Sequence, residues 1–341
     1  MRPGKKSGAP RLSMEVGRGI HRITLPLPGP RPGPVNAYLF VGDNVSLLDT
    51  GTAQAAGRLS KALGELGYRF SDIDRIVLTH GHIDHYGSAA RIMAASRGRT
   101  RLYVHREDAA SVETGQEARK RTTERFLALM GVPLSLRLSL LSVFFVFMQM
   151  AETARPDRFL EEGDTVQMGC HRARIMETPG HTRGSVCLLI EREGLLFSGD
   201  MVLPHITPNA LAMVEDGLTV PSRRAQDEFY RSLSRIEEAA PRVVHPGHGR
   251  AIGDLPAIAS LYRTLFSERQ EKVLDLLSRG ESTVWEVARA LFPEIQKLGY
   301  RTALESYLAV SEVFTHAQEL AADEKIALRR AGNRILLRKE P

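Results

Sequence analysis

The sequence has few cysteines and no long apolar run, and both shortages narrow the kinds of protein that it can encode. Only two cysteines occur among its 341 residues, Cys170 and Cys187, and they lack the C-x-x-C spacing of a thiolate zinc site. Two cysteines fit a reducing compartment without establishing one. The longest apolar run, residues 138–150, is shorter than the roughly 20 residues that cross a bilayer, so we expect a protein outside the membrane. The first 16 residues contain no apolar core of a signal peptide, and we expect the cytoplasm as its location.

The composition excludes wholesale disorder and leaves charge as a weak guide to partners. Hydrophobic residues make up 43% of the chain and charged residues 25%, as in ordinary globular proteins. Much of the formal net charge of +6 comes from basic residues near the two ends, which we interpret as solvated. A chain of this length can form one large domain and one small one, each with its own core.

Residues 14–262 show short apolar segments that alternate with amphipathic helices, which favours a layered α/β domain. Residues 1–13 are expected to form a flexible tail. In layered sheets of this kind, binding sites gather in the loops just past the strand ends. The polar residues that follow the predicted strands are therefore the first candidates for a functional site.

Two segments depart from this alternation. Residues 111–159 predict an insertion of two helices, one charged and one too apolar on all sides to lie in water. The apolar helix is either an ordinary buried helix or oligomer contact, or a lid in which Phe144 and Phe147 hold an acyl or aromatic group. Residues 263–341 predict three helices followed by a hairpin around residues 331–333, which is the order of a winged helix-turn-helix.

Titratable side chains are crowded into LTHGHIDHYGSA, residues 78–89, directly after the predicted strand at 76–78. Side chains on a loop can turn toward one centre, whereas a strand would divide them between its two faces. Other polar residues follow later strand ends beside glycine or proline, which let the backbone turn sharply. If these strand ends share one edge of the sheet, seven nitrogen and oxygen ligands meet there: His80, His82, Asp84, His85, His181, Asp200 and His248.

Electrostatics favours metal ions at such a centre. Protonated histidines held close together would repel each other by roughly 1 to 4 kcal/mol per pair. A divalent cation removes this repulsion because it binds neutral imidazole. A single structural zinc needs only about four ligands, whereas seven ligands without a thiolate fit two divalent cations that share one carboxylate. Zinc is the cation that we expect, with manganese or iron as alternatives.

Five motifs, in this chain order, resemble those of the metallo-β-lactamase-fold hydrolase superfamily: Asp49, the H-x-H-x-D-H of residues 80–85, His181, Asp200 and His248. Five short segments match sequences typical of the family: VNAYLF, LLDTG, ETPGHT, FSGD and HPGHG. The resemblance covers about residues 18–260. It implies an α/β (α+β) fold, the αββα sandwich, with the metal ions at one edge.

The resemblance also implies a role for each of these residues. It assigns the first cation to His80, His82 and His181, the second to Asp84, His85 and His248, and the bridge between them to Asp200. Asp49 resembles the family's aspartate that orients the ligand loop. For such a centre we hypothesise that a hydroxide bridging the cations is the nucleophile, and Asp84 is a candidate proton acceptor.

The substrate class stays open at this point. GDMVLPHITPN, residues 199–209, resembles hydrolases of the glyoxalase II-like group and favours a small thioester or ester. The C-terminal segment resembles a domain of a mitochondrial endoribonuclease of this fold, which keeps a metal-dependent endoribonuclease or phosphodiesterase open; a lactonase is a further alternative. Asp200 stands where subclass B1 β-lactamases carry cysteine, which argues against an antibiotic-degrading enzyme. Arg183 and His205 are candidate substrate contacts, since an arginine beside a ligand can grip a phosphate or carboxylate.

The expected partner is therefore a small-molecule substrate. The predicted third C-terminal helix carries Glu305, Glu312 and Glu319 against Arg301 alone, which argues against sequence-specific DNA recognition. The basic residues lie in the hairpin instead, which leaves weak RNA contact open. Otherwise the C-terminal domain is expected to pack on the catalytic body or to mediate a homodimer.

Overall fold

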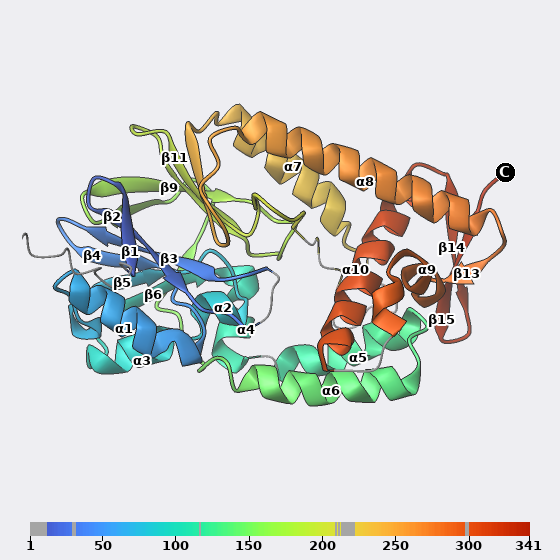
Figure 1. Cartoon of the computed structure of the whole chain (residues 1–341), viewed down its shortest axis with the longest axis horizontal. Coiled ribbons are helices and arrows are strands. Elements are labelled where there is room, and N and C mark those ends of the chain that lie inside the picture. The colour runs from blue at the N-terminus through green and yellow to red at the C-terminus, as the bar shows by residue number, and fades with distance from the viewer. Residues whose placement is uncertain are drawn as a thin grey trace, which may run out of the picture.

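The computed structural model describes residues 12–28, 32–115, 117–208, 210, 212, 222–296 and 300–341, without the side chains of residues 117–121, 141, 143–148, 296 and 300–304. Figure 1 shows an elongated molecule with a two-sheet body at one end and a mostly helical body at the other. Helix α8 (Leu255–Leu277) runs along one side of both. Most of the predicted N-terminal tail, residues 1–11, lies outside the described residues, whereas Ser13 already begins strand β1.

The first sheet contains seven strands within the described residues, in the order β1-β2-β3-β4-β5-β6-β7. Neighbours from β1 to β4 are antiparallel, and those from β4 to β7 are parallel. Strand β3 is buried along nearly its whole length, as its apolar sequence VNAYLFV requires. The strands are β1 (Ser13–Gly17), β2 (Ile20–Leu25), β3 (Val35–Val41), β4 (Val45–Leu48), β5 (Arg75–Val77), β6 (Arg101–His105) and β7 (Arg158–Leu160).

The second sheet has the order β12-β11-β10-β9-β8. Its β11–β12 pair is parallel and its other pairs are antiparallel. Because β4, β5 and β6 run parallel in the first sheet and β11 and β12 in the second, several strands of each sheet end at one common edge. The strands are β8 (Thr165–Met168), β9 (His171–Glu177), β10 (Val186–Ile190), β11 (Leu195–Gly199) and β12 (Val243–Pro246).

The two sheets pack face to face, with helices on both outer faces. Phe40 and Val77 from the first sheet meet Leu188 and Phe197 from the second in a buried apolar layer. Helices α1 (Ala56–Glu65) and α3 (Ala89–Ala95) cover the first sheet, and α7 (Ala225–Glu238) and α8 cover the second. The expected αββα sandwich is confirmed. Short 3-10 helices lie at Ala53–Ala55, Phe70–Asp72 and Pro293–Gln296.

The helical body begins in the second half of α8, which runs without interruption through the domain boundary expected after residue 262. It continues with β13 (Ser282–Thr283), α9 (Val284–Leu291), α10 (Tyr300–Ala322), β14 (Ile326–Ala331) and β15 (Arg334–Lys339). A capping box between Thr283 and Glu286 starts α9. The hairpin expected around residues 331–333 joins β14 and β15. The order of helices and hairpin agrees with a winged helix-turn-helix, which stays a prediction.

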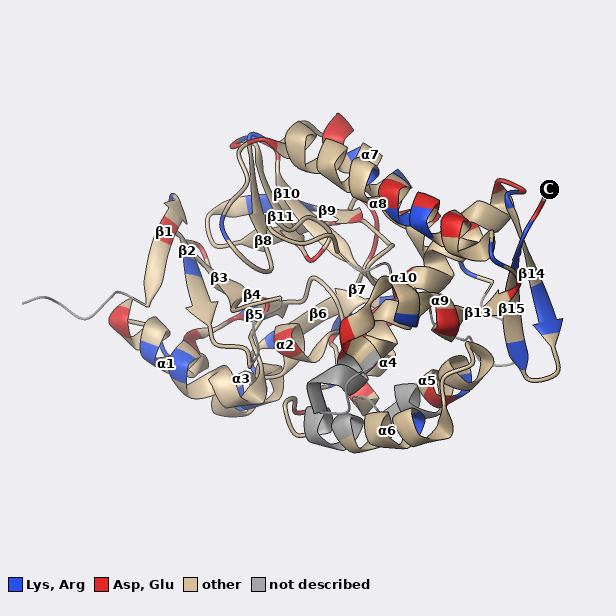
Figure 2. Cartoon of the chain, turned by 45° about the vertical axis from the view of Figure 1, so that its right-hand side comes forward, with Lys and Arg blue, Asp and Glu red and all other residues tan. Residues whose placement is uncertain are grey.

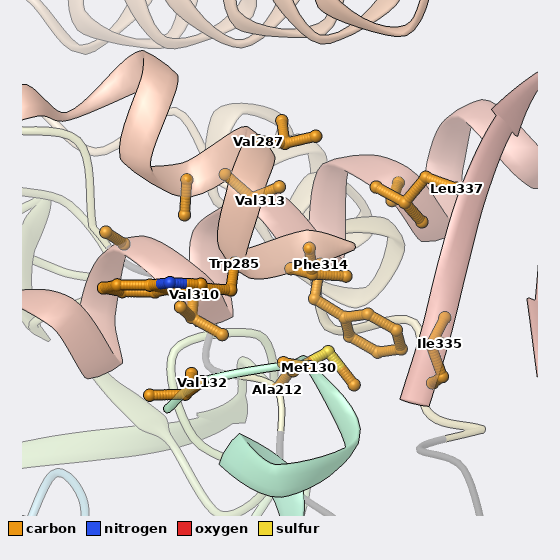
Figure 3. Close-up of a cluster of buried hydrophobic side chains, with 14 of the residues drawn as sticks. Met130, Val132, Ala212, Trp285, Val287, Val310, Val313, Phe314, Ile335 and Leu337 are labelled. Carbon is orange, nitrogen blue, oxygen red and sulfur yellow. The ribbon is translucent and has the colours of Figure 1, made fainter. Parts of the chain in front are cut away.

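The insertion expected at residues 111–159 packs on this helical body. Its helices are α5 (Glu117–Leu129) and α6 (Leu134–Met148), reached through α4 (Arg106–Thr114). Figure 3 shows Met130 and Val132, between α5 and α6, against Trp285 and Phe314 of α9 and α10. On α6 itself Leu140 is buried while Leu134 and Leu138 are exposed, so the choice between a buried helix and a lid stays open. The side chains of Phe144 and Phe147, on which the lid depends, lie outside the described residues.

Several charged residues of the helical body form ion pairs with other residues of the protein. Figure 2 shows Lys and Arg along β14 and β15. There Arg329 pairs with Glu281, at 2.7 Å between Nη2 and Oε2. On α10, Glu312 pairs with Arg269 and Glu319 with Arg224. Weak RNA contact of the hairpin and the absence of DNA recognition stay predictions. Among the described residues, no helix combines the length and the apolarity needed to cross a membrane.

His245 is a buried histidine outside the predicted ligand set. Its burial makes the free energy of unfolding depend on pH. Its ring stacks on Phe197, with centroids 5.0 Å apart, and burial followed by the positive charge of Arg22 lowers the pKa of His245 to about 4. The unfolded chain therefore takes up this proton first, near the ordinary value of about 6.5. Its contribution to the free energy of unfolding is complete above about pH 6.5 and is lost as the pH falls toward 4.

We expect His245→Phe to lose less stability than the wild type between pH 7 and pH 4.5, by on the order of 3 kcal/mol. Urea unfolding of both proteins at the two pH values, with excess chelator, measures this difference. His21→Gln, which replaces a half-buried histidine of β2, is the control and should follow the wild type. Equal losses in the wild type and His245→Phe would contradict the assignment.

Candidate metal centre

All seven predicted ligands lie at the common edge of the two sheets. His80 and His82 follow β5, His181 follows β9, Asp200 follows β11 and His248 follows β12. Asp84 and His85 lie on a short helix, α2 (Ile83–Tyr86), rather than on the open loop that the spacing suggested. His82 precedes its first residue as the N-cap. The helical turn places Asp84 and His85 beside the loop histidines instead of carrying the chain away from them.

His80, His82 and His181 form one group of candidate ligands, whose nitrogen atoms lie within 4.8 Å of one another. His82 Nδ1 lies 3.0 Å from His80 Nε2 and 3.0 Å from His181 Nε2. The three rings meet edge to face, with centroids 4.6 to 4.9 Å apart. Three imidazoles aimed at one point are a common arrangement around a divalent cation.

Asp84, His85 and His248 form a second group within the same 4.8 Å limit, and Asp200 lies between the two groups. Asp84 Oδ2 is 3.3 Å from His248 Nε2 and 3.9 Å from His85 Nε2. Asp200 Oδ1 is 3.5 Å from His85 Nε2, and its Oδ2 is 3.5 Å from His248 Nε2 and 3.8 Å from His181 Nε2. Asp200 also forms a third, overlapping group with His80 and His85. This position suits a carboxylate shared by two cations.

Three buried atoms at the centre have no hydrogen-bond partner among the described residues: His85 Nε2, Asp200 Oδ1 and His248 Nε2. A buried polar atom without a partner destabilises the folded state by roughly 1 to 3 kcal/mol. His85 Nε2 lies 3.5 Å from Asp200 Oδ1, and His248 Nε2 lies 3.3 Å from Asp84 Oδ2, so a cation bound among these groups would coordinate all three atoms. Imidazole nitrogens and carboxylate oxygens without a thiolate are ligands that suit zinc, manganese or iron. The residues present therefore fit divalent metal ions.

The charges of the centre also fit a cation. Burial, followed by the nearby His85, lowers the pKa of His80 well below its ordinary value, so His80 is a neutral ligand. Burial alone would lower the pKa of His248, but Asp200 and Asp84 raise it to about 10. Burial is likewise outweighed at His85, where Asp49, Asp200 and Asp84 raise the pKa well above its usual range. Without metal the carboxylates are thus balanced by imidazolium, and a bound cation takes over that charge.

Asp49, predicted to orient the ligand loop, lies directly behind His85. It has a positive φ of 57° at the end of β4, and its Oδ2 is 2.8 Å from His85 Nδ1. It also accepts hydrogen bonds from the backbone N–H and the hydroxyl of Thr79, both at 2.9 Å. With Nδ1 bonded to a carboxylate, the other nitrogen of His85 faces the centre.

His248 is oriented by backbone carbonyls, and a residue that the sequence analysis did not single out holds its loop. His248 Nδ1 donates to the carbonyl oxygens of Gly33 and Pro34, at 3.0 and 3.1 Å. The side chain of Asn36 donates to the carbonyl oxygens of Pro246 and Gly249, on either side of His248. Asn36 is the second residue of the segment VNAYLF. An amide side chain within an otherwise apolar strand could have indicated its structural role from the sequence.

The predicted substrate contacts lie outside the two ligand groups. Arg183 Nε is 3.3 Å from Glu107 Oε2 on α4, so the guanidinium is ion-paired within the protein. His205 is exposed beside Gly249 and bonds through Nε2 to the carbonyl oxygen of Pro32, at 2.8 Å. Both residues border loops that carry a ligand, and their contact with a substrate stays a prediction. A buried carboxylate that no motif marked, Asp108, bonds to the loops that carry His80, His82 and His181.

Comparison with known proteins connects this geometry to a family. Residues 30–248 match the family described as "Metallo-beta-lactamase superfamily". The chain is 27% identical over 310 residues to the "Probable metallo-hydrolase YqjP" of Bacillus subtilis, with 89% of this chain and 92% of the relative covered. It is 28% identical over 189 residues to an "Atrochrysone carboxyl ACP thioesterase" of Aspergillus chevalieri, with 52% and 56% covered. A solved metallo-beta-lactamase family protein from Thermus thermophilus superposes with a TM-score of 0.80 at 26% identity, with 94% and 99% covered.

Proposed function

Because this chain belongs to the metallo-beta-lactamase superfamily and is a hydrolase, we propose that it cleaves a small thioester or ester at a centre of two divalent cations. The observation that carries the proposed metal centre is the set of three buried ligand atoms without a hydrogen-bond partner, which belong to overlapping groups of convergent side chains. Such atoms are costly unless a cation coordinates them. Zinc is the proposed metal, with manganese or iron as alternatives.

The seven side chains divide the binding between them. His80, His82 and His181 would hold the first cation, and Asp84, His85 and His248 the second; Asp200 would contribute to both. When bound, the two cations supply Lewis acidity, which turns water into a hydroxide nucleophile near neutral pH and polarises the substrate carbonyl. Asp84 and Asp200 offset only half of the charge of two divalent cations, so the centre favours an anionic nucleophile and a developing oxyanion.

Asp84 fits a ligand of this centre better than the proton acceptor for which it was also a candidate. Burial alone would raise its pKa, but His85 and His248 lower the pKa of Asp84 to about 2. A carboxylate with so low a pKa is a weak base at neutral pH, where an efficient acceptor has a pKa near the working pH. Asp84 therefore holds the second cation and balances its charge.

Charge pairing beside His181 supports an acyl substrate over a nucleic acid. Arg183 is paired with Glu107, and Arg223 with Glu228, at 2.6 Å between Nε and Oε2. Arg223 also donates to the carbonyl oxygen of Thr182. A strand of RNA is bound by a groove of unpaired basic residues and exposed aromatics. Arginines that are already paired with carboxylates suit a thioester or ester better, and the name of the Aspergillus relative, a thioesterase, points the same way.

A panel of four substrates tests the proposal on zinc-loaded and manganese-loaded protein: an acyl-thioester, a lactone, bis-p-nitrophenyl phosphate and single-stranded RNA. We expect the thioester to be hydrolysed with the highest kcat/KM, and chelator-treated protein to be inactive toward all four. Metal analysis of the same samples relates turnover to bound ions. Cleavage of the phosphodiesters alone would overturn the thioester assignment in favour of a nuclease or phosphodiesterase.

A further inference from the structure

Asp108 is a buried carboxylate in the first turn of α4, and its side chain bonds to two separate loops of the metal centre. It is 1% exposed. Its Oδ2 accepts hydrogen bonds from the backbone N–H of Gly81 and from the hydroxyl of Thr182, both at 2.7 Å. Its Oδ1 accepts one from the backbone N–H of Gly184, at 3.2 Å. Three donors from two loops therefore share one carboxylate.

These donors are adjacent to the three histidines of the first ligand group. Gly81 lies between His80 and His82, and Thr182 directly follows His181. The position of the Gly81 amide affects the directions of both neighbouring imidazoles, because the two histidines flank it. The carboxylate thus fixes the distance between the His80–His82 loop and the His181 loop, a distance on which cooperation of the three nitrogens depends.

Two glycines allow the ligand loops to come close to Asp108. A Cβ at Gly184 would lie 2.8 Å from Asp108 Cγ, and a Cβ at Gly81 would lie 3.0 Å from the Asp108 carbonyl oxygen. Only glycine allows the backbone of each loop to come so close. The start of α4 is itself held, since His105 caps the helix by accepting a hydrogen bond from the Glu107 N–H at 3.2 Å. Glu107 in turn pairs with Arg183 of the same loop as Thr182 and Gly184.

Asp108 bonds to both loops of the first group, whereas Asp49 bonds directly to His85 and reaches His80 only through Thr79, whose hydroxyl lies 3.0 Å from His80 Nδ1. Asp49 contacts Thr79 and His85, and His85 belongs to the second group. We propose that Asp108 is a positioning residue for the first cation: it holds the His80–His82 loop against the His181 loop. The inference rests on the two-cation centre proposed above. Loss of the charge of Asp108 would weaken the binding of the first cation. Binding of the second would still be supported by Asp49.

Asparagine is the informative replacement because it keeps the shape of Asp108 but not its set of acceptors. A carboxylate offers two acceptor oxygens, whereas an amide offers one oxygen and one NH2 group. Whichever way the amide is turned, its NH2 group faces either the Gly184 N–H or the pair formed by the Gly81 N–H and the Thr182 hydroxyl. At least one loop then loses its hydrogen bond and meets a donor instead.

The test is a zinc titration of the full chain against a competing chelator, which needs no substrate. We expect two zinc ions in the wild type. In Asp108→Asn one ion should bind about 10- to 100-fold more weakly, the usual cost of losing such a partner, while the other keeps its affinity. Thr182→Val, which removes one of the three hydrogen bonds to Asp108 together with the contact of the hydroxyl with Ser185, should weaken the same ion less, and Thr182→Ser should restore it. Asp157→Asn is the matched control, because Asp157 accepts a backbone hydrogen bond from Leu102, away from the ligand loops.

Wild-type affinities for both ions in Asp108→Asn, or equal weakening of both, would overturn the inference. Thr182→Val keeps the test decisive if Asp108→Asn does not fold, and circular dichroism identifies that case. A wild type that binds two zinc ions but hydrolyses no thioester would contradict the proposed substrate and leave the Asp108 result intact. A wild type that binds fewer than two ions would overturn both proposals.

Discussion

Replacing Asp200 by alanine is expected to abolish hydrolysis and to lower the metal content to about one ion per chain or fewer. Asp200 is the only one of the seven ligands whose two oxygens face histidines of both groups, at 3.5 Å from His85 and His248 and 3.8 Å from His181. Its removal takes one ligand from each cation and leaves an excess of positive charge between them. We expect kcat/KM to fall by at least about 10³-fold, because the two cations act as one unit.

Metal analysis and kinetics on the same protein preparation measure both effects. The control is Asp323→Ala, which removes an exposed carboxylate that pairs with Lys325 at 3.0 Å, far from the ligand loops in the chain. It should keep the metal content and the activity of the wild type. Wild-type turnover by Asp200→Ala that holds less than about one ion per chain would contradict the metal assignment.

Adding one methyl group at Gly247 is expected to disturb the centre almost as much as the loss of a ligand. A Cβ at this position would overlap Asp200 Oδ1 and lie 2.9 Å from His85 Cε1. The backbone cannot easily move away, because Gly247 N–H donates to the Gly199 carbonyl and its own carbonyl accepts from Asn36 N–H, both at 2.7 Å. Asp200 or His85 must shift instead, and a misplacement of about 1 Å costs on the order of 10²-fold in rate.

We therefore expect Gly247→Ala to fold, to bind metal more weakly and to lose about 10²-fold in kcat/KM. Gly253→Ala is a matched control six residues further along, since a Cβ there meets nothing within 4 Å. It should behave as the wild type in zinc titration, in kinetics and in thermal unfolding. Wild-type zinc affinity in Gly247→Ala would mean that the close packing around Asp200 has no part in metal binding.

The layered fold and the positions of the ligands could be predicted because both depend on local patterns. Apolar segments such as residues 186–190 predicted buried strands, and Gly or Pro beside His181, Asp200 and His248 indicated sharp turns after them. Side chains that follow parallel strands must meet at one edge of a sheet. The resemblance to a family then assigned each ligand, and the structure brings all of them together.

Other features could not be predicted, because they depend on contacts between distant segments. Nothing in the local sequence stops α8 at residue 262, since its apolar stripe passes from one core to the next. The apolar insertion was open to a lid or a buried helix; Met130, Val132 and Leu140 pack in the core with α9 and α10, whereas Leu134 and Leu138 are exposed. Asp108 is one of two acidic residues in the first turn of α4, beside Glu107, and acidic residues are common at helix starts whatever their role.

By itself, the sequence determined the chemistry of this protein: its strand ends, its seven nitrogen and oxygen ligands and the absence of thiolates among them. These follow from residue type and from spacing within short segments. Only the tertiary structure decided that the ligand atoms lie within 4.8 Å of one another in overlapping groups, that Arg183 pairs with Glu107, and that Asp108 bonds to two ligand loops. The physical reason is that a hydrogen bond or ion pair depends on distances of about 3 Å between atoms. Residues 74 positions apart, such as Asp108 and Thr182, come that close only after the sheets have packed.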